Sequence, residues 1–200
     1  QVIIICKKEK PDKPYFFRTG DYWAEKINVI ASTSTDLIKK LDILPIYIDE
    51  IKLSIFNKII QDNISLGQIS YTCRGLGLQN RIKSDGDIPI LRGDNIEKFS
   101  IYGDIEKITL SKEDLRSKKL KLLKQQKIVS QNIVAHIMNP FDRIKIMATI
   151  DDEGYLTLDT VMNTFIKDNS YPSKYILCIL NSKLSEWFYY WFVYNRAIRT

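Results

Sequence analysis

Residues 66–101 read LGQISYTCRGLGLQNRIKSDGDIPILRGDNIEKFSI, and this stretch decides the fold class. An alternating apolar run comes first, followed by a Gly-rich basic loop, a short apolar run that ends at Leu91, and a third apolar run. Short apolar runs separated by turn residues predict strands, and loops between strands carry variable, functional side chains. The stretch therefore predicts a sheet that presents a polar loop to a binding partner.

The loops of this stretch carry residue types that reach base edges and phosphates in nucleic-acid complexes. As candidates for base readout we take Arg74, Gln79, Asn80, Arg81 and Lys83, together with Arg92, Asp94 and Asn95 in the following turn. Two other interpretations of the Gly-rich loop remain open. The glycines alone favour a tight turn, and Arg74 with Arg81 weakly supports a phosphate cradle.

A basic block follows this stretch. The net charge of the chain is +6, and residues 116–150 hold eight Lys or Arg against one acid, Asp142. That window alone carries +7, so it suits a polyanion, first nucleic acid and second an anionic membrane surface, although a solvated helix face gives the same pattern. The candidates for phosphate contact are Arg116, Lys118, Lys119, Lys121, Lys124, Lys127, Arg143 and Lys145.

The remaining pattern predicts an α+β fold of mixed, mostly antiparallel sheets with packed helices. Isoleucines at helical spacing predict a helix over residues 49–63, and Ser111 with Asp114 forms a capping signal for a basic helix over 112–124. A long aromatic helix is expected over 172–195, with a buried stripe from Ile176 to Trp191, and a short helix over 32–41. Strands are expected at residues 1–6, 15–18, 27–31, 43–48, 107–110, 127–130, 133–138, 143–150, 155–158 and 161–166.

Candidates for catalysis are few. The three cysteines are widely spaced, which indicates reduced thiols of a cytoplasmic protein and no zinc site or disulfide framework. His136 is the single histidine and suits an ordinary strand position. Residues 139–141, Asn-Pro-Phe, lack the second proline of the base-holding loop of amino-methyltransferases, and no glycine loop opens a helix for a nucleotide. We therefore predict no catalytic residue, cofactor site or metal site, and no membrane span, because charges interrupt the apolar segment 175–194.

Five segments in order resemble the TaqI-like C-terminal specificity domain of DNA adenine methyltransferases and fused type II restriction-modification enzymes. They are LGQISYTCRGLGLQN (66–80), ILRGDNI (90–96), KIVSQNI (127–133), GYLTLDTVMNTFI (154–166) and KYILCILNSKLSEWFYY (174–190). The resemblance implies recognition of a sequence in double-stranded DNA by this chain. It also implies a catalytic domain of the same polypeptide that binds S-adenosylmethionine and flips an adenine.

The same resemblance implies a domain order. Residues 1–31 are expected to be terminal strands of the upstream methyltransferase domain, residues 32–65 a connecting helical segment, and residues 66–200 the target-recognition domain, truncated at its C-terminal end. Endonuclease activity of the parent enzyme stays open. Two alternatives remain: the recognition domain of a type I specificity subunit, and a protein-interaction module that uses its aromatic C-terminal helix.

Overall fold

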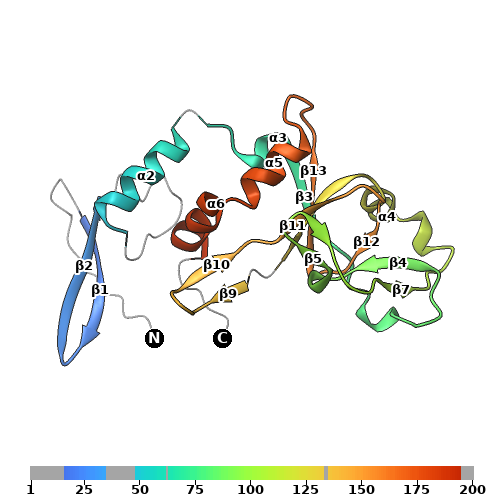
Figure 1. Cartoon of the computed structure of the whole chain (residues 1–200), viewed down its shortest axis with the longest axis horizontal. Helices are drawn as coiled ribbons and strands as arrows, with labels where there is room; N and C mark the ends of the chain where they lie inside the picture. The colour runs from blue at the N-terminus through green and yellow to red at the C-terminus, as the bar shows by residue number, and fades with distance from the viewer. Residues whose placement is uncertain (1–15, 35–47, 62, 133–134, 195–200) are drawn as a thin grey trace. The chain divides into compact units, whose positions relative to one another are not determined.

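The structure is a computed structural model that describes residues 16–34, 48–61, 63–132 and 135–194 (Figure 1). It is a mixed α+β protein with small, mostly antiparallel sheets and, in these residues, five α-helices. This confirms the predicted fold class. The chain divides into two compact units, Gln1–Gln61 with Trp191–Thr200, and Asp62–Tyr190. We call them the terminal unit and the central unit.

A four-stranded antiparallel sheet forms the centre of the central unit, in the order β11-β8-β13-β3. Its strands are β3 (Ser70–Arg74), β8 (Lys127–Gln131), β11 (Ala148–Asp151) and β13 (Val161–Ile166). β13 pairs with both β3 and β8, so Asn163 faces Cys73 on one side and Val129 on the other. The expected strands at 127–130 and 161–166 are confirmed.

A second sheet of three strands lies beside it, in the order β12-β4-β7. β4 (Ile88–Leu91) pairs antiparallel with β7 (Glu106–Ile108) and parallel with β12 (Leu156–Thr157). Two hairpins complete the unit: β5 (Ile96–Glu97) with β6 (Ser100–Ile101), and β9 (Ala135–Ile137) with β10 (Arg143–Lys145). The stretch 66–101 thus supplies strands to three different sheets.

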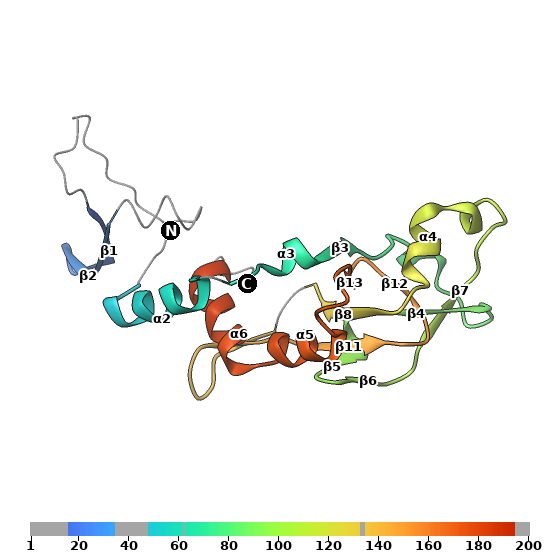
Figure 2. The same ribbon diagram turned by 90° about the horizontal axis from the view of Figure 1, so that it is seen from above.

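Apolar side chains from strands and helices meet in three clusters of the central unit. Helix α4 (Lys118–Leu123), labelled in Figure 2, buries Leu120 and Leu123 in a cluster with Ile90, Ile108 and Leu156 of the three-stranded sheet. Helices α3 (Leu66–Ile69) and α5 (Ser173–Leu180) pack on the four-stranded sheet through residues such as Ile69 and Ile176. A third cluster joins β4 and β5 to the four-stranded sheet.

The predicted helix at the C-terminus is broken, which corrects the expectation of one helix. α5 ends at Leu180 with Asn181 as its C-cap, and α6 (Lys183–Phe188) begins after the N-cap Ser182. A π-helical segment, η4 (Tyr189–Tyr194), follows. The Asn181 amide exchanges two hydrogen bonds with the Ala148 backbone, at 2.9 and 3.1 Å. The break rotates the buried face, so Glu186 is buried while Leu184 of the predicted stripe is exposed.

The terminal unit contains the hairpin β1 (Phe16–Trp23) and β2 (Lys26–Ser34) and the helix α2 (Glu50–Ile60). The predicted helix over 49–63 is confirmed, with Asp49 as its N-cap. The prediction that isoleucines form the buried face is only partly correct, because Phe56 is the buried residue of this helix. Its ring stacks on that of Phe192, with 4.3 Å between the ring centroids. Residues 32–34 continue β2 and are not helical, whereas the expected elements at 1–6, 35–41 and 43–47 lie outside the described residues.

Candidate nucleic-acid interface

The Gly-rich loop is fixed at its start to the turn between β12 and β13. The Leu76 N–H donates to the Thr157 carbonyl at 2.7 Å, and the Asp159 N–H donates to the Leu76 carbonyl at 2.9 Å. A Cβ on Gly75 would lie 2.1 Å from the Leu158 carbonyl oxygen, so only glycine permits this close approach. Gly77 has no such neighbour.

Asp159, in the same turn, positions two of the predicted base-reading side chains. Its carbonyl accepts hydrogen bonds from Arg74 Nε and Nη2 at 3.3 and 3.2 Å, and its Oδ1 accepts one from Gln79 Nε2. Oriented so that its oxygen faces Arg74, the Asn132 amide accepts from the same guanidinium at 2.9 Å. Arg74 and Gln79 are therefore held by hydrogen bonds to the turn between β12 and β13, although both residues are exposed to solvent.

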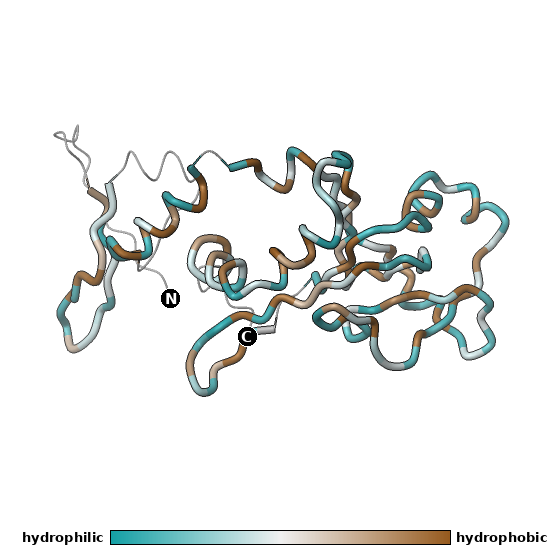
Figure 3. The backbone as a smooth tube through the Cα atoms, turned by 45° about the horizontal axis from the view of Figure 1, so that its top comes forward, coloured by the Kyte–Doolittle hydropathy of each residue, from teal (hydrophilic) through white to brown (hydrophobic). Residues whose placement is uncertain are grey.

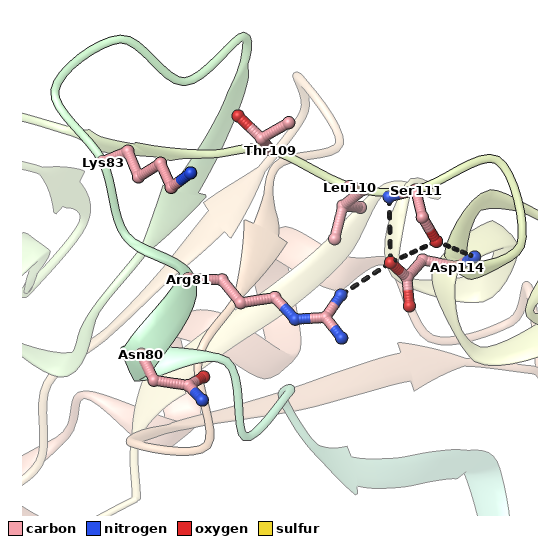
Figure 4. A pocket seen from close by; sticks show the side chains of 7 residues that line it. All are labelled: Asn80, Arg81, Lys83, Thr109, Leu110, Ser111 and Asp114. Atoms are coloured by element: carbon pink, nitrogen blue, oxygen red, sulfur yellow. Dashed lines mark hydrogen bonds and ion pairs between the residues drawn. The ribbon is translucent and has the colours of Figure 1, made fainter.

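The following turn, η1 (Gln79–Arg81), opens onto a hollow that Figure 4 shows from close by. The hollow measures about 440 Å³ and is lined by Asn80, Arg81, Lys83, Thr109, Leu110, Ser111 and Asp114. Arg81 Nη1 reaches across it to Asp114 Oδ2 at 2.6 Å. The side chains of Asn80 and Lys83 are exposed and make no hydrogen bond to a described residue, so their donors are available to a ligand.

Asp114 is held in place by Ser111. The Ser111 N–H and Oγ–H both donate to Asp114 Oδ2, and the Asp114 N–H donates back to Ser111 Oγ at 3.1 Å. The predicted reciprocal hydrogen bonds between Ser111 and Asp114 are thus present, but they precede the 3-10 turn η3 (Asp114–Arg116), whose N-cap is Glu113. The α-helix α4 begins only at Lys118, which corrects the expectation of one helix over 112–124. The hydrogen bonds from Ser111, with that of Arg81, lower the pKa of Asp114 below its ordinary value, so it stays ionised and orients Arg81.

The second candidate segment is the turn η2 (Gly93–Asn95), and it is fixed to the same β12–β13 turn. The Gly93 N–H donates to Thr160 Oγ1 at 3.0 Å, next to Asp159. Arg92 is half-buried and pairs with Glu106 at 2.9 Å, whereas Asp94 is exposed. The turn between β12 and β13 thus anchors both predicted recognition segments.

The structure corrects the prediction for Asn95. Its side chain is 6% exposed, and its Oδ1 accepts from the Arg92 N–H while its Nδ2 donates to the Tyr102 and Asp104 carbonyls. All of its hydrogen-bonding groups stabilise the turn itself. Asn95 is therefore not available to a base in this structure.

The basic helix α4 lies next to the Gly-rich loop, and Lys119 joins the two, with its Nζ donating to the Gly75 carbonyl at 2.8 Å. Lys118, Lys121 and Lys124 are exposed and make no hydrogen bond or ion pair with a described residue. Lys118 and Lys121 lie within α4 and Lys124 is its C-cap, whereas Leu120 and Leu123 of the same helix are buried. Arg116, at the end of η3, is exposed as well.

Lys127 is the clearest correction among the predicted phosphate contacts. Its side chain is 0% exposed and pairs with Asp151, which is equally buried. Its Nζ also donates to the carbonyls of Leu123 and Tyr155, at 2.5 and 2.9 Å. Burial lowers the pKa of Lys127, an effect that the ion pair with Asp151 opposes. This lysine links α4 to the sheet and cannot reach a phosphate.

Arg143 and Lys145 lie on β10, in a hairpin away from the Gly-rich loop (Figure 1). Both are half-buried, and Arg143 Nη1 donates to the Asn139 carbonyl at 2.8 Å. No hydrogen bond or ion pair of the described residues connects them to α4. The predicted basic block is thus divided between two surfaces.

The residues that the sequence analysis missed are Asp159, Thr160 and Glu106. Asp159 and Thr160 follow the apolar run 155–158, which is a weak signal for a turn, and Glu106 lies between Ile105 and Lys107; neither position indicates the partner. Their partners lie between 14 and 85 positions away in the sequence. Only the sheet topology brings these residues together.

The described residues hold no group of acidic, cysteine and histidine side chains that would ligate a metal ion. Burial raises the pKa of the Cys73 thiol, although Lys119 and Lys127 oppose this, so Cys73 is a poor nucleophile at neutral pH. None of the described helices is long and apolar enough to cross a membrane.

Comparison with known families agrees with this geometry. The family model of the TaqI-like C-terminal specificity domain matches residues 88–198, more than half of the chain. The chain belongs to this family. No curated protein matches it. A TaqI-like specificity domain recognises the DNA target of a restriction-modification enzyme, so DNA is the partner of this chain.

The TaqI-like region contains most of the elements described above. The turn η2, the helix α4 and the anchoring residues Asp159 and Thr160 lie inside the matched region, whereas the Gly-rich loop precedes it. The resemblance predicted from residues 66–200 is therefore confirmed for its larger part. The individual base and phosphate contacts remain predictions.

Proposed function

We propose that this TaqI-like domain binds the target duplex of an adenine-specific DNA methyltransferase or of a fused type II restriction-modification enzyme. In this proposal the Gly-rich loop reads base edges and α4 contacts the phosphate backbone. The observation that carries this proposal is the contact between the Gly-rich loop and the α4 region. Lys119 Nζ donates to the Gly75 carbonyl, and Arg81 pairs with Asp114 just before α4. One bound duplex can therefore contact both.

Base readout centres on the hollow beside η1. Asn80 offers an amide that donates and accepts, Lys83 offers an ammonium, and Arg81 keeps part of its guanidinium exposed at the rim. Such side chains pair with adenine or guanine edges in the major groove, each good bidentate contact contributing about 1–3 kcal/mol. Arg74, Gln79, Arg92 and Asp94 flank this group.

Phosphate contact falls to the exposed cations of η3 and α4, namely Arg116, Lys118, Lys121 and Lys124. Lysines on one helix face contact successive phosphates and release counterions, which gives affinity without sequence preference. Lys119 holds the loop against the helix. This arrangement separates affinity from specificity within one surface.

The same proposal includes the parent enzyme. Residues 1–31 would complete an upstream methyltransferase domain, residues 32–65 would connect it, and that domain would bind S-adenosylmethionine and flip the adenine. In this proposal the cofactor site and the catalytic groups belong to that upstream domain. Methyltransferase motifs upstream in the parent gene would support this order, whereas a second recognition repeat with spacer helices would indicate a type I specificity subunit.

The direct test is selection of bound duplexes from a randomised library by the 200-residue chain at low salt, followed by sequencing. We expect enrichment of one short motif, with binding that weakens steeply as salt is raised. A negative control is a variant with Lys118, Lys121 and Lys124 changed to Glu, which should retain few duplexes. Absence of any binding at low salt would contradict DNA recognition and favour a protein-interaction module.

A further inference from the structure

The hairpin formed by β9 and β10 presents two large apolar side chains at its tip. Met138 is 69% exposed and Phe141 is 65% exposed, on either side of Asn139 and Pro140. The hairpin projects from the central unit as a separate loop in Figures 1 and 3. Scattered exposed apolar residues are common, but two within four positions at a projecting tip form a defined apolar feature.

This tip is organised by its own residues. Arg143 Nη1 donates to the Asn139 carbonyl at 2.8 Å and to the Phe141 carbonyl at 3.3 Å, and its guanidinium lies 5.1 Å from the centre of the Phe141 ring. The base of the hairpin is anchored by Ile144, which is buried, and by the Ile146 N–H, which donates to Glu186 Oε1. The Phe141 ring is thus held beside a positive charge.

The charge of the hairpin indicates the class of partner. Arg143 and Lys145 lie directly behind the tip on β10, and the one acid of the hairpin, Asp142, has its Oδ1 3.7 Å from His136 Nε2. An apolar tip flanked by cations matches a nucleic-acid duplex, whose apolar base stack lies between two rows of phosphates.

We propose that Met138 and Phe141 form a wedge that inserts between two neighbouring base pairs of the bound duplex, while Arg143 and Lys145 contact the adjacent phosphates. Proteins that kink DNA insert Phe or Met side chains in this way and unstack one base step. This inference rests on the proposed function, and it assigns the second basic surface, which the Gly-rich loop and α4 leave unused.

The test uses the duplex selected by the chain, with 2-aminopurine placed at each position in turn, because its fluorescence rises when a neighbouring base unstacks. We expect a rise at one step with the unchanged chain. The double variant Met138→Ala/Phe141→Ala should lose that rise and bind about tenfold more weakly. The conservative variant Met138→Leu/Phe141→Leu should keep the rise.

Tyr175→Ala is the matched control, because Tyr175 is an exposed aromatic residue on α5 of the same unit. It should leave both fluorescence and affinity unchanged. Binding by the unchanged chain without a rise at any position, or a rise that survives in the double alanine variant, would overturn the wedge and leave the proposed function intact. Failure of the unchanged chain to bind any duplex would instead overturn the proposed function and the wedge with it.

Discussion

Lys127 illustrates how far a single residue can be interpreted from sequence. It occurs in the basic block whose charge predicts phosphate contact, yet the structure buries it completely beside Asp151. Its surroundings in the sequence contain the signal, because it begins the apolar strand KIVSQ and its partner Asp151 ends another strand. Charge counting alone does not separate a buried lysine from an exposed one.

This burial predicts a large stability effect. Lys127→Met should lower the free energy of unfolding by about 3–5 kcal/mol, because it leaves the Asp151 carboxylate buried without its partner. Urea denaturation followed by circular dichroism measures the change. The control Lys121→Met, at an exposed position of α4, should stay within about 0.5 kcal/mol. Equal effects of the two substitutions would contradict the buried pair.

Glu186 gives the stability a defined pH dependence. Its burial raises the pKa, but hydrogen bonds from Lys98 and Lys183 outweigh this and lower it below the ordinary value of 4.5. Below about pH 4.5 the unfolded chain therefore binds the proton more readily than the folded one, so this residue's stabilising contribution decreases as the pH falls through the lowered pKa.

We predict that Glu186→Gln reduces this acid dependence. Thermal unfolding between pH 3 and pH 6 measures it, and the substituted chain should show a smaller drop in Tm on acidification than the unchanged chain. At pH 6 the variant should be less stable, because Lys98 loses its ion pair at 2.6 Å. An unchanged pH profile would show that other carboxyl groups control acid unfolding.

Asp159 was missed because its role depends on partners 80 and 85 positions earlier. Asp159→Ala removes the carboxylate that holds Gln79 but keeps the carbonyl that holds Arg74. We predict that the variant selects a more degenerate motif from the duplex library while its salt dependence is unchanged. Gln126 provides a matched control, since Gln126→Ala removes a similar exposed hydrogen bond, to Asp152, outside this surface. A motif equally sharp in both variants would contradict the positioning role.

At the scale of elements, the spacing of apolar residues predicted most helices and strands. Strands β8, β12 and β13 and helix α2 follow that pattern closely. The break between α5 and α6 could not be predicted in the same way, because Asn181 is compatible with a helix until the Ala148 backbone pairs with its amide. Local propensity is overridden there by a contact 33 residues away.

Helix α4 is the element whose role is most directly testable. The variant Lys118→Glu/Lys121→Glu/Lys124→Glu should weaken binding to all duplexes alike and reduce the slope of log affinity against log salt by about 3. Fluorescence anisotropy with an arbitrary duplex over a range of salt concentrations measures both. The fold should survive, since all three side chains are exposed. A changed base preference would contradict the phosphate role.

At the scale of the whole molecule, the order of the strands is what brings the two candidate segments together. β12 pairs in parallel with β4, and the turn that follows leads into β13 of the other sheet. That crossing brings Asp159 to Gln79, 80 positions earlier in the sequence, and Thr160 to Gly93, 67 positions earlier. The two candidate segments follow from residue type alone, whereas their common anchor follows only from the sheet topology.

The family and the fold class could be predicted because they depend on the order of many residues along the chain. Each predicted DNA contact depends instead on the surroundings of a single residue. The match over residues 88–198 agrees with the resemblance inferred from five short segments. Of the sixteen predicted contact residues, the structure removes Asn95 and Lys127 by burial. The others remain accessible, wholly or in part, on the two surfaces described.

The central claim is that the Gly-rich loop beside the hollow determines the sequence preference for DNA, while α4 supplies affinity for any duplex. The most direct measurement compares affinities for the selected duplex and a scrambled duplex in two variants, Asn80→Ala/Lys83→Ala and the triple lysine-to-glutamate variant of α4. We predict that the Asn80→Ala/Lys83→Ala variant loses most of the ratio of affinities between the selected and the scrambled duplex. The α4 variant should lose affinity for both duplexes equally. A loop variant that keeps the full ratio, or an α4 variant that changes it, would contradict this account.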